Sequence, residues 1–444
     1  MFALRPLRPR GWLLVIFGVL ALLLAAYFGR RDLLMVAVFC FLLPVAACLG
    51  IYALRPGVSV QRHISPSLSQ VGLAVNVTLE VRGSNPGGSR IRLVETLPPG
   101  FNGARPFSFP QPVVPHGRLS RYHYELHPRH RGVFTLGPLK GHFTDPFDVA
   151  FAQRALDAGD LLTVAPAAVE LPAISLGDSR GNDGSQASRS PAHASHDDAM
   201  AREYRHGDPL RRVHWPVTAR AGKLMVRAEE SVTTPEAALI LDQRPGAFGP
   251  ELAANPGEAD SSGSLRTTAL FETAVVAAVS VASHLLERGY TLRILDQLGQ
   301  PAFSSSPSAA NPEQEDFAGP TAALEVSAAL AAVELAGVHT ATVPHREPFA
   351  ESLAHKLQQS RRRGPLVAIT GTLSAQEALL LAGTSEQSAG AYALVLCHDT
   401  ADAGEALEIL RRAGWQAAAL TRHSPVEDAW AQLESETLHL GGGR

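Results

Sequence analysis

The chain has 444 residues, of which 39 are lysine or arginine and 42 are aspartate or glutamate, so its formal net charge is −3. A chain of this length can hold two or three domains, each with its own core. The near balance of charges gives no overall positive field, so we expect no nucleic-acid partner. The chain contains only three cysteines, which form no recognisable disulfide framework.

Two apolar stretches near the beginning of the chain predict a membrane anchor. Residues 11–29 and 33–54 contain no charged side chain, and each stretch is long enough as a helix to cross a hydrocarbon core of about 30 Å. A signal peptide is the rival interpretation, because arginines precede the first stretch. No clear small-residue cleavage site follows, however, and a second stretch comes at once. The sequence therefore predicts a two-helix transmembrane hairpin in residues 1–56.

The charges around these stretches predict how the hairpin is oriented. Only Arg30, Arg31 and Asp32 join the two stretches, so both flanks lie on the same side of the membrane. Five arginines in the flanks outweigh the two in the turn. We therefore expect a multi-pass protein of the plasma membrane, in contact with the lipid bilayer, whose large soluble part lies in the cytoplasm.

Residues 57–165 change to short runs in which apolar and polar residues alternate. Examples are VSVQRHI and LAVNVTLEVRG, and turn sequences such as SNPGG and LPPGF separate the runs. This pattern predicts antiparallel strands that form an immunoglobulin-like β-sandwich. No cluster of a nucleophile, a base and an orienting residue is recognisable in it, which favours a spacer or binding module.

A basic stretch follows a linker within residues 166–235. Gly, Ser and Asp dominate residues 177–198, which is typical of a mobile loop or linker. Residues 201–230, AREYRHGDPLRRVHWPVTARAGKLMVRAEE, then contain seven arginines and lysines. In this stretch Asp208 and Pro209 predict the start of a short helix, as cap and first helical residue.

The rest of the basic stretch predicts a turn and a strand. Pro216 disfavours helical geometry at Trp215, so we expect the helix to end there. Gly222 fits a turn, and residues 223–229 alternate like a strand. The arginines of the stretch are therefore gathered around one small helix–turn–strand unit.

Three interpretations of this unit remain open. Its guanidinium groups could recognise an anion or an acidic partner, since they suit carboxylates and phosphates. Alternatively, Arg202, Asp208 and Arg220 form an ion-pair network that joins the unit to the next domain. Trp215 would then pack in the core, and we favour this structural role. An enzyme would use His214 as a base and Asp208 as its orienting partner, but no nucleophile or oxyanion site is evident.

Residues 236–444 alternate apolar strands with amphipathic helices. Strand-like runs such as AALILD, YTLRILD and GPLVAIT are separated by helical patterns at Thr268–Arg288 and Thr321–Ala336. Ser374 followed by Glu377 predicts a further helix that begins with a capping box. The alternation predicts a mainly parallel, doubly wound α/β sheet, whose sites lie beyond the carboxyl ends of the strands.

The basic stretch resembles the defining motif of the DUF58 family. The matching residues are Arg202, Tyr204, Gly207, Asp208, Arg211, Trp215, Ala219 and Arg220. The segment RHRGVFTLGPLKGHFTDPFDVA also resembles this family's Arg-Gly segment and Asp-Pro-Phe turn. The resemblance implies a membrane hairpin, a sandwich and a C-terminal von Willebrand factor A-like domain. Together with His214, the motif residues are the candidate interaction site, and Arg202, Asp208, Arg211 and Arg220 are the residues to mutate first.

The resemblance raises the question of a metal ion in the C-terminal domain. Von Willebrand A domains that bind magnesium use an Asp-x-Ser-x-Ser loop after the first strand, because a hard cation prefers oxygen ligands. Here Asp242 keeps the aspartate, but Arg244 and Gly246 stand where the serines would be. Further on, Thr370 and Gly371 stand where an aspartate and a glycine are expected. We therefore predict no bound metal and no cofactor, with Asp242 as the partner of an arginine instead.

The resemblance further implies a function in protein assembly. Relatives are associated with MoxR-type AAA+ ATPases, so the expected role is a membrane-anchored, non-enzymatic scaffold or adaptor in the assembly or maturation of protein complexes. Other membrane or envelope proteins are the further partners expected, and the high alanine and arginine content hints at a GC-rich bacterial genome. The alternatives are a membrane-bound enzyme and a polyanion-binding protein, each using the Arg and His residues of 202–220.

Overall fold

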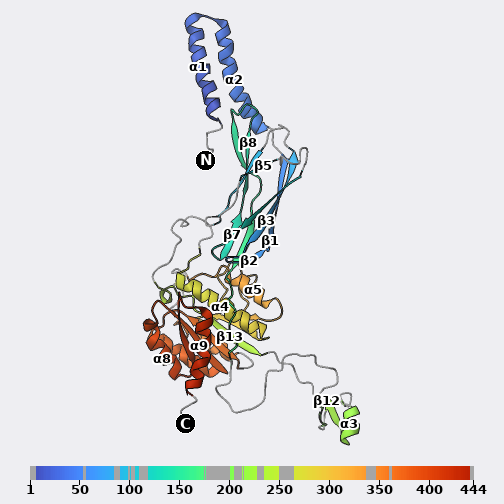
Figure 1. Ribbon diagram of the computed structural model, residues 1–444, viewed down its shortest axis with the longest axis vertical. Coiled ribbons are helices and arrows are strands. Elements are labelled where there is room, and N and C mark those ends of the chain that lie inside the picture. The colour runs from blue at the N-terminus through green and yellow to red at the C-terminus, as the bar shows by residue number, and fades with distance from the viewer. Residues whose placement is uncertain are drawn as a thin grey trace.

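The computed structural model shows a long molecule with three successive parts, namely a helical hairpin, a sheet-rich region and an α/β region (Figure 1). The structure describes residues 7–53, 57–84, 91–98, 101, 106–109, 119–174, 176, 201–204, 213, 215–227, 235–249, 265–336, 347–359 and 363–440. The hairpin lies at one end of the long axis and the α/β region at the other, with the sheet-rich region between them.

The hairpin consists of two apolar helices, α1 (Pro9–Phe28) and α2 (Arg31–Ala53), which pack against each other. Their mean hydropathies are 2.4 and 2.7, and both are long and apolar enough to cross a membrane. Gly29, with a φ of 63°, ends α1 in the left-handed conformation that glycine adopts without strain. These helices mark the chain as a membrane protein.

The described residues of the sheet-rich region form three small sheets. The first is antiparallel and consists of β1 (Gly57–Ser65), β3 (Val75–Ser84) and β6 (Leu119–Leu126). The second is also antiparallel, in the order β5 (Phe107–Phe109), β4 (Ile91–Glu95), β8 (Leu139–Thr144) and β9 (Phe151–Ala155). The third has the order β2 (Leu68–Gln70), β10 (Asp160–Ala165) and β7 (Gly132–Leu136), and here β2 runs parallel to β10.

Strand β3 shows how these sheets form two layers. Its residues Val75, Val77, Leu79 and Val81 alternate with polar ones, so all four point to one face. Val75 and Val77 belong to a core shared with β7 and β10, whereas Leu79 and Val81 belong to one shared with β4, β5 and β8. One face of the first sheet is thus covered by the other two sheets, placed one after the other along it.

A buried arginine ties the two layers together. The side chain of Arg62 is fully buried and lies 2.8 Å from Glu95, 2.9 Å from Asp157 and 2.6 Å from Asp160. Burial raises the pKa of Glu95, although the nearby Arg62 acts to lower it. Nε and Nη1 of Arg62 donate charge-assisted hydrogen bonds to Glu95 and Asp160, whereas its Nη2 and the Oε2 of Glu95 make no hydrogen bond in the described part of the chain. The ion pairs therefore offset part of the cost of burying these charges.

The α/β region is built on a six-stranded sheet in the order β15-β14-β13-β16-β17-β18. The strands are β13 (Glu236–Leu241), β14 (Thr291–Asp296), β15 (Asp316–Phe317), β16 (Pro365–Thr370), β17 (Gly390–Cys397) and β18 (Gln416–Thr421). All neighbouring pairs are parallel except β14 with the short edge strand β15. This agrees with the mainly parallel sheet that the sequence predicts.

Helices cover both faces of this sheet. One core contains residues of α4 (Ala269–Glu287), α5 (Ala322–Leu330) and α9 (Val426–Leu440). The opposite core contains residues of α6 (Glu351–Gln358), α7 (Ala375–Gly383) and α8 (Gly404–Arg412). Helix α4 is also long and apolar enough to cross a membrane, but its apolar side chains are packed in the first core. The region is therefore doubly wound.

Another buried arginine joins the sheet-rich region to the α/β region. Arg131, just before β7, donates from Nε and Nη2 to the two carboxylate oxygens of Glu272 at 2.9 and 3.0 Å. Its Nη1 donates to the carbonyls of Leu330 and Ala331, and its guanidinium lies 5.8 Å from the ring centre of Phe271. Only 2% of the Arg131 side chain is exposed. One side chain from the sheet-rich region thus satisfies groups on both α4 and the end of α5.

Candidate functional site

The basic stretch forms a small hairpin with one helix. β11 (Ala201–Glu203) pairs antiparallel with β12 (Met225–Arg227), and α3 (Trp215–Ala221) lies between them in the chain. The Thr218 hydroxyl of α3 accepts a hydrogen bond from the Met225 N–H at 3.0 Å. Gly222, with a φ of 67°, makes the turn between α3 and β12. The turn and the strand are those expected from the sequence.

The structure describes some of the predicted motif residues. Arg202 lies in β11, opposite Val226 of β12. Tyr204 follows β11, is half-buried, and its N–H donates to the Leu224 carbonyl at 2.9 Å. Arg220 is exposed in the last turn of α3. The other four predicted motif residues, Gly207, Asp208, Arg211 and His214, lie outside the described residues.

Trp215 corrects two expectations. The helix was expected to end at this residue, but α3 begins here, since Pro216 is tolerated in the first turn, where no helical partner exists for the missing N–H. Val213, which was expected inside the helix, makes an isolated bridge with Val226. The indole was also expected in a core, but 66% of Trp215 is exposed. The tryptophan therefore belongs to the surface of this unit.

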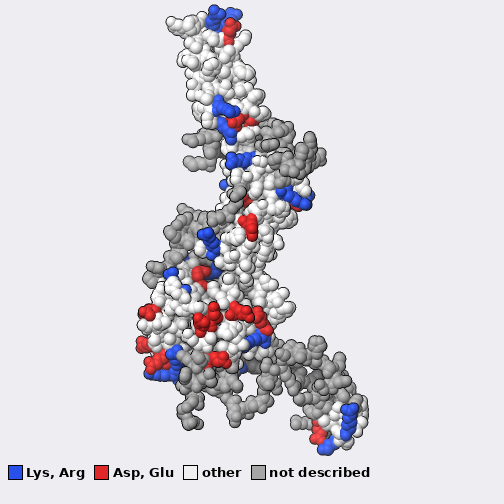
Figure 2. Space-filling view, viewed as in Figure 1, with Lys and Arg blue, Asp and Glu red and all other residues white. Residues whose placement is uncertain are grey.

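The hairpin unit, marked by the labels α3 and β12, lies away from the six-stranded sheet in Figure 1. Lys and Arg side chains are visible on its surface in Figure 2. Lys223 pairs with Glu203 at 2.9 Å, and both side chains are largely exposed. The ion-pair network proposed for Arg202, Asp208 and Arg220 includes Asp208, which lies outside the described residues, so it stays a prediction.

The second predicted position, Asp242, lies at the carboxyl edge of the sheet directly after β13. Its side chain is fully buried. Oδ1 accepts hydrogen bonds from the backbone N–H and from Nε of Arg244, at 3.0 and 2.9 Å. Oδ2 accepts from Nη2 of the same residue at 2.8 Å. The carboxylate is thus paired with the side-chain fork of an arginine two residues further on.

The guanidinium of Arg244 is held from three sides. Besides Asp242 it pairs with Glu377, and it lies 5.1 Å from the ring centre of Phe349. Burial alone would raise the pKa of Glu377, but hydrogen bonds from Ser374 and the charge of Arg244 keep it below its ordinary value. Glu377 also closes the capping box of α7 with Ser374. The arginine therefore links two loops at the carboxyl edge.

This geometry does not fit a magnesium ion. Both carboxylate oxygens of Asp242 are engaged by Arg244, which puts a positive charge where a hard cation would need free oxygen ligands. Because Leu241 pairs with Ile369, the next residue of β16, Thr370, is the neighbour of Asp242. Its hydroxyl is buried and has no hydrogen-bond partner in the part of the chain described. A threonine and an arginine-bound aspartate make a poor cation site.

We expect no saturable heat when magnesium chloride is titrated into the purified full-length protein. The physical reason is that binding would have to displace the Arg244 guanidinium from two carboxylates. Isothermal titration calorimetry of metal-stripped protein measures this. A saturable one-to-one heat that is lost in Asp242→Asn would contradict the prediction.

A second aspartate at this edge is expected to give the protein a distinct pH dependence. Asp296 ends β14, and burial raises its pKa to about 6, although the Leu298 and Gln300 N–H groups donate to it. The folded state therefore binds this proton more tightly than the unfolded chain, whose pKa is near 3.8. The resulting stabilisation is present below about pH 4 and is lost as the pH rises through about 6.

Between about pH 4 and 6 we expect the wild type to lose stability as the pH rises, by up to about 1.4 kcal/mol per pH unit. We expect this loss to be absent in Asp296→Asn. Asparagine keeps the carbonyl oxygen that accepts both backbone bonds. Urea unfolding at several pH values, followed by tryptophan fluorescence, measures the difference from the wild type. Equal pH slopes for the two proteins would show that Asp296 does not titrate in this way.

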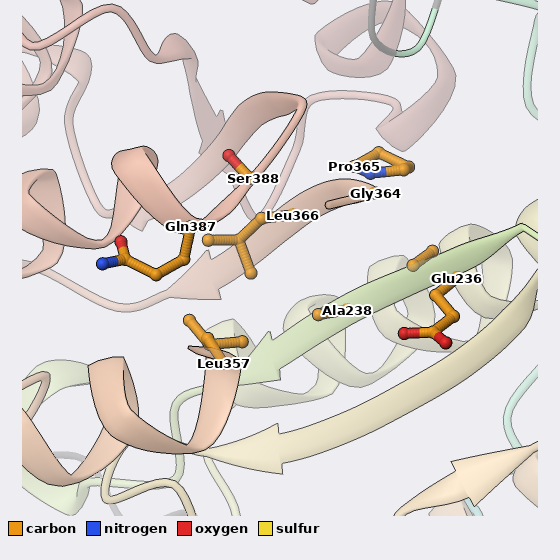
Figure 3. A pocket seen from close by; sticks show the side chains of 9 residues that line it. Glu236, Ala238, Leu357, Gly364, Pro365, Leu366, Gln387 and Ser388 are labelled. Atoms are coloured by element: carbon orange, nitrogen blue, oxygen red, sulfur yellow. The ribbon is translucent and has the colours of Figure 1, made fainter. Parts of the chain in front are cut away.

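Two cavities lined by described residues show no assembled catalytic group. One of about 20 Å³ lies at the amino ends of β13 and β16, next to Glu236 and Gln387, and has room for little more than a water molecule (Figure 3). Another, of about 500 Å³, lies between Leu68 of β2 and helix α5. Glu325 is the one ionisable side chain among its described lining residues. General acid–base chemistry needs more than that single carboxylate.

Sequence reasoning missed the role of Arg131. The Arg-Gly segment that contains it was noted only as a resemblance, and its partner Glu272 lies 141 residues further along the chain. The Asp-Pro-Phe turn was noted in the same way. There the carboxylate of Asp145 accepts hydrogen bonds from the N–H groups of Phe147, Val149 and Ala150, at 2.9, 2.7 and 2.6 Å. The signals available in the sequence were an arginine with no acidic residue close to it in the chain and an aspartate at the start of a turn.

Comparison with known proteins finds a similarity that covers both the hairpin unit and the loop that carries Asp242. No curated protein matches the chain. The model of a family described as "Protein of unknown function DUF58" matches residues 200–251. This range spans the hairpin unit, β13 and the loop that carries Asp242 and Arg244. The match shows that this part of the chain is similar to the DUF58 family.

Proposed function

We propose that the protein is a membrane-anchored, non-enzymatic scaffold or adaptor that works with a MoxR-type AAA+ ATPase in the assembly or maturation of protein complexes. The resemblance of the basic stretch supports the ATPase partner. The apolar hairpin supports the anchor, and the arginines that flank it support a cytoplasmic soluble part. The long three-part arrangement in Figure 1 suits a protein that holds a binding surface away from the bilayer.

We further infer that the two soluble regions are an immunoglobulin-like sandwich and a von Willebrand A-like domain. The two-layered packing around β3 supports the first inference. The strand order, which in chain order reads 3-2-1-4-5-6 with an antiparallel third strand, supports the second. The position of Asp242 immediately after the first strand of that sheet also agrees with it.

The observation that carries the proposed function is the exposure of apolar side chains on the hairpin unit. Trp215 is 66% exposed and Leu224 is 42% exposed, beside the exposed cations Arg220 and Lys223. Exposed tryptophan and arginine are the residues that most often supply binding energy in protein interfaces. A surface of this composition fits an acidic protein partner better than it fits catalysis.

An affinity purification tests the proposal. Tagged full-length protein is isolated from detergent extract with and without ATP, and the co-purified proteins are identified by mass spectrometry. We expect an AAA+ ATPase to be recovered in a nucleotide-dependent manner, and Trp215→Ala to reduce the recovery at least tenfold, which corresponds to about 1.4 kcal/mol. Leu161→Ala is the matched control, because Leu161 is 67% exposed in the sheet-rich region.

The outcomes separate the alternatives. If no ATPase is recovered, or if Trp215→Ala binds as well as the control, the proposed function fails. A membrane-bound enzyme would instead lose turnover in His214→Ala without losing its fold. A polyanion-binding protein would show binding that falls steeply with salt concentration.

A further inference from the structure

The turn at residues 145–150 lies directly against the beginning of the membrane hairpin. The Arg8 N–H donates to the Val149 carbonyl at 2.9 Å, and Leu7 forms a β-bridge with Ala150. Gly11 is packed against the turn so closely that a Cβ there would lie 2.7 Å from the Val149 carbonyl oxygen. Arg8 also pairs with Asp148. Helix α1 therefore begins on the surface of this turn.

This contact fixes the depth of the turn. Helix α1 has 20 residues and is about 30 Å long, which matches the hydrocarbon thickness of a bilayer, so Pro9 marks the boundary between lipid and headgroups. The headgroup layer adds about 5–8 Å on each side. Phe147 is two residues from Val149, so their Cα atoms are at most about 8 Å apart. Phe147 is thus at the level of the headgroups.

Phe147 is presented there rather than packed away. It is 63% exposed at the tip of the turn, next to the exposed Pro146, while Asp145, Val149 and Ala150 on either side are buried. The turn that carries it is held by three hydrogen bonds to the Asp145 carboxylate, which is 7% exposed, and Asp148 has a φ of 58°. An ordered turn that keeps an aromatic ring in the open at headgroup depth is what a membrane-interface anchor requires.

Basic side chains surround this turn. Arg10 is 70% exposed on its side chain, and Arg8 lies over the ring of Phe151 at 5.9 Å. His142, which packs edge-on against Phe151, has its pKa lowered by burial and then by the charges of Arg92, Lys140 and Arg8. Figure 2 shows Lys and Arg side chains where the uncharged surface of the hairpin meets the sheet-rich region. Cations gathered at this level complement the phosphates of anionic headgroups.

We propose that residues 145–150, with Phe147 at the tip and the basic side chains around it, form a lipid-contact surface that inserts into the headgroup layer. The surface fixes the sheet-rich region against the bilayer instead of letting it hang from the hairpin. Trp12, one turn into α1 and 55% exposed, extends the same aromatic belt. The proposal rests on the membrane location of the hairpin and not on the ATPase partner.

Spin labelling of the full-length protein in nanodiscs containing anionic phospholipid tests this proposal. Single cysteines replace Phe147, Leu161 or Leu20 in a background whose three native cysteines are alanine, and far-ultraviolet circular dichroism confirms that each variant is folded. Leu161, at 67% exposure, reports on water, and Leu20, at 51% exposure in α1, reports on lipid. The measured quantity is the ratio of collisional accessibility to oxygen and to a water-soluble nickel chelate.

The expected ratio at position 147 is several-fold higher than at position 161 and lies between those at 161 and 20. An equal ratio at 147 and 161, with a high ratio at 20, would overturn the proposal while leaving the membrane location intact. A low ratio at position 20 would overturn the membrane location itself. The last measurement uses nanodiscs of neutral lipid. There the basic side chains lose their anionic partners, so position 147 is expected to be more accessible to the nickel chelate than in anionic nanodiscs.

Discussion

Replacing Arg131 by alanine is expected to destabilise the junction between the sheet-rich and α/β regions by about 3 kcal/mol. The variant loses both hydrogen bonds to Glu272 and leaves the carbonyls of Leu330 and Ala331 without their donor. The Glu272 side chain is 40% exposed, so water screens part of its charge. The expected cost is therefore at the lower end of the range of about 3–5 kcal/mol for breaking a buried ion pair. Local opening should become about a hundredfold more frequent.

Hydrogen–deuterium exchange of the full-length protein measures this opening. We expect faster exchange in residues 132–136 and at the beginning of α4, with unchanged exchange in β16 and β17. Arg266→Ala is the matched control, because Arg266 pairs with Glu334 at 2.9 Å but is 51% exposed on its side chain. An exposed pair of this kind is worth less than about 1 kcal/mol. Equal effects of the two variants would show that Arg131 does not hold the junction.

Replacing Arg244 by alanine is expected to lower the free energy of unfolding of the α/β region by about 3–5 kcal/mol. The change leaves the fully buried carboxylate of Asp242 without its counter-charge and removes the link to Glu377. Trp415 and Trp430 are both buried in this region, at 3% and 0% exposure, so their fluorescence reports its unfolding. Urea unfolding of the purified protein gives the midpoint and the slope.

A second substitution separates charge from packing in this cluster. If the cost of Arg244→Ala comes from the unpaired charge, then Asp242→Asn in the same chain restores part of the lost stability, because an amide is cheaper to bury than a carboxylate. Arg244→Lys, which keeps the charge but not the fork, is expected to lie between wild type and Arg244→Ala. A double variant as unstable as the sum of the two single ones would contradict a direct coupling.

The sequence predicted those elements whose boundaries depend on local chemistry. Thr268 caps α4 with a hydrogen bond from the Phe271 N–H, and Gly289, with a φ of 80°, follows its end. The capping box of Ser374 and Glu377 is also present. In each case one or two residues supply or remove a backbone hydrogen bond within a single turn. Such interactions can be recognised without knowing the rest of the fold.

The remaining features depend on tertiary contacts. The helix expected at Thr321–Ala336 ends at Leu330, because the following backbone bonds elsewhere: the Leu335 and Ala336 N–H groups donate to the carbonyls of Arg266 and Gln243. For the candidate site, the sequence predicted an arginine partner for Asp242, but not that Glu377 and Phe349 would hold this arginine. Trp215 was placed in a core on the general preference of tryptophan, which a small separate unit cannot satisfy.

The direction of the strands in the sheet-rich region determines how this protein would respond to mechanical force. β1 leaves the membrane end and pairs with β3 over its whole length, from Gly57 opposite Ser84 to Ser65 opposite Asn76. β10 ends beside α5, at the far end of the same region. Figure 1 shows these strands lying along the long axis. The hydrogen bonds between paired strands are perpendicular to the strands. A force that pulls the α/β region away from the membrane would therefore act along the strands and load these hydrogen bonds in shear, all at the same time, instead of breaking them one after another.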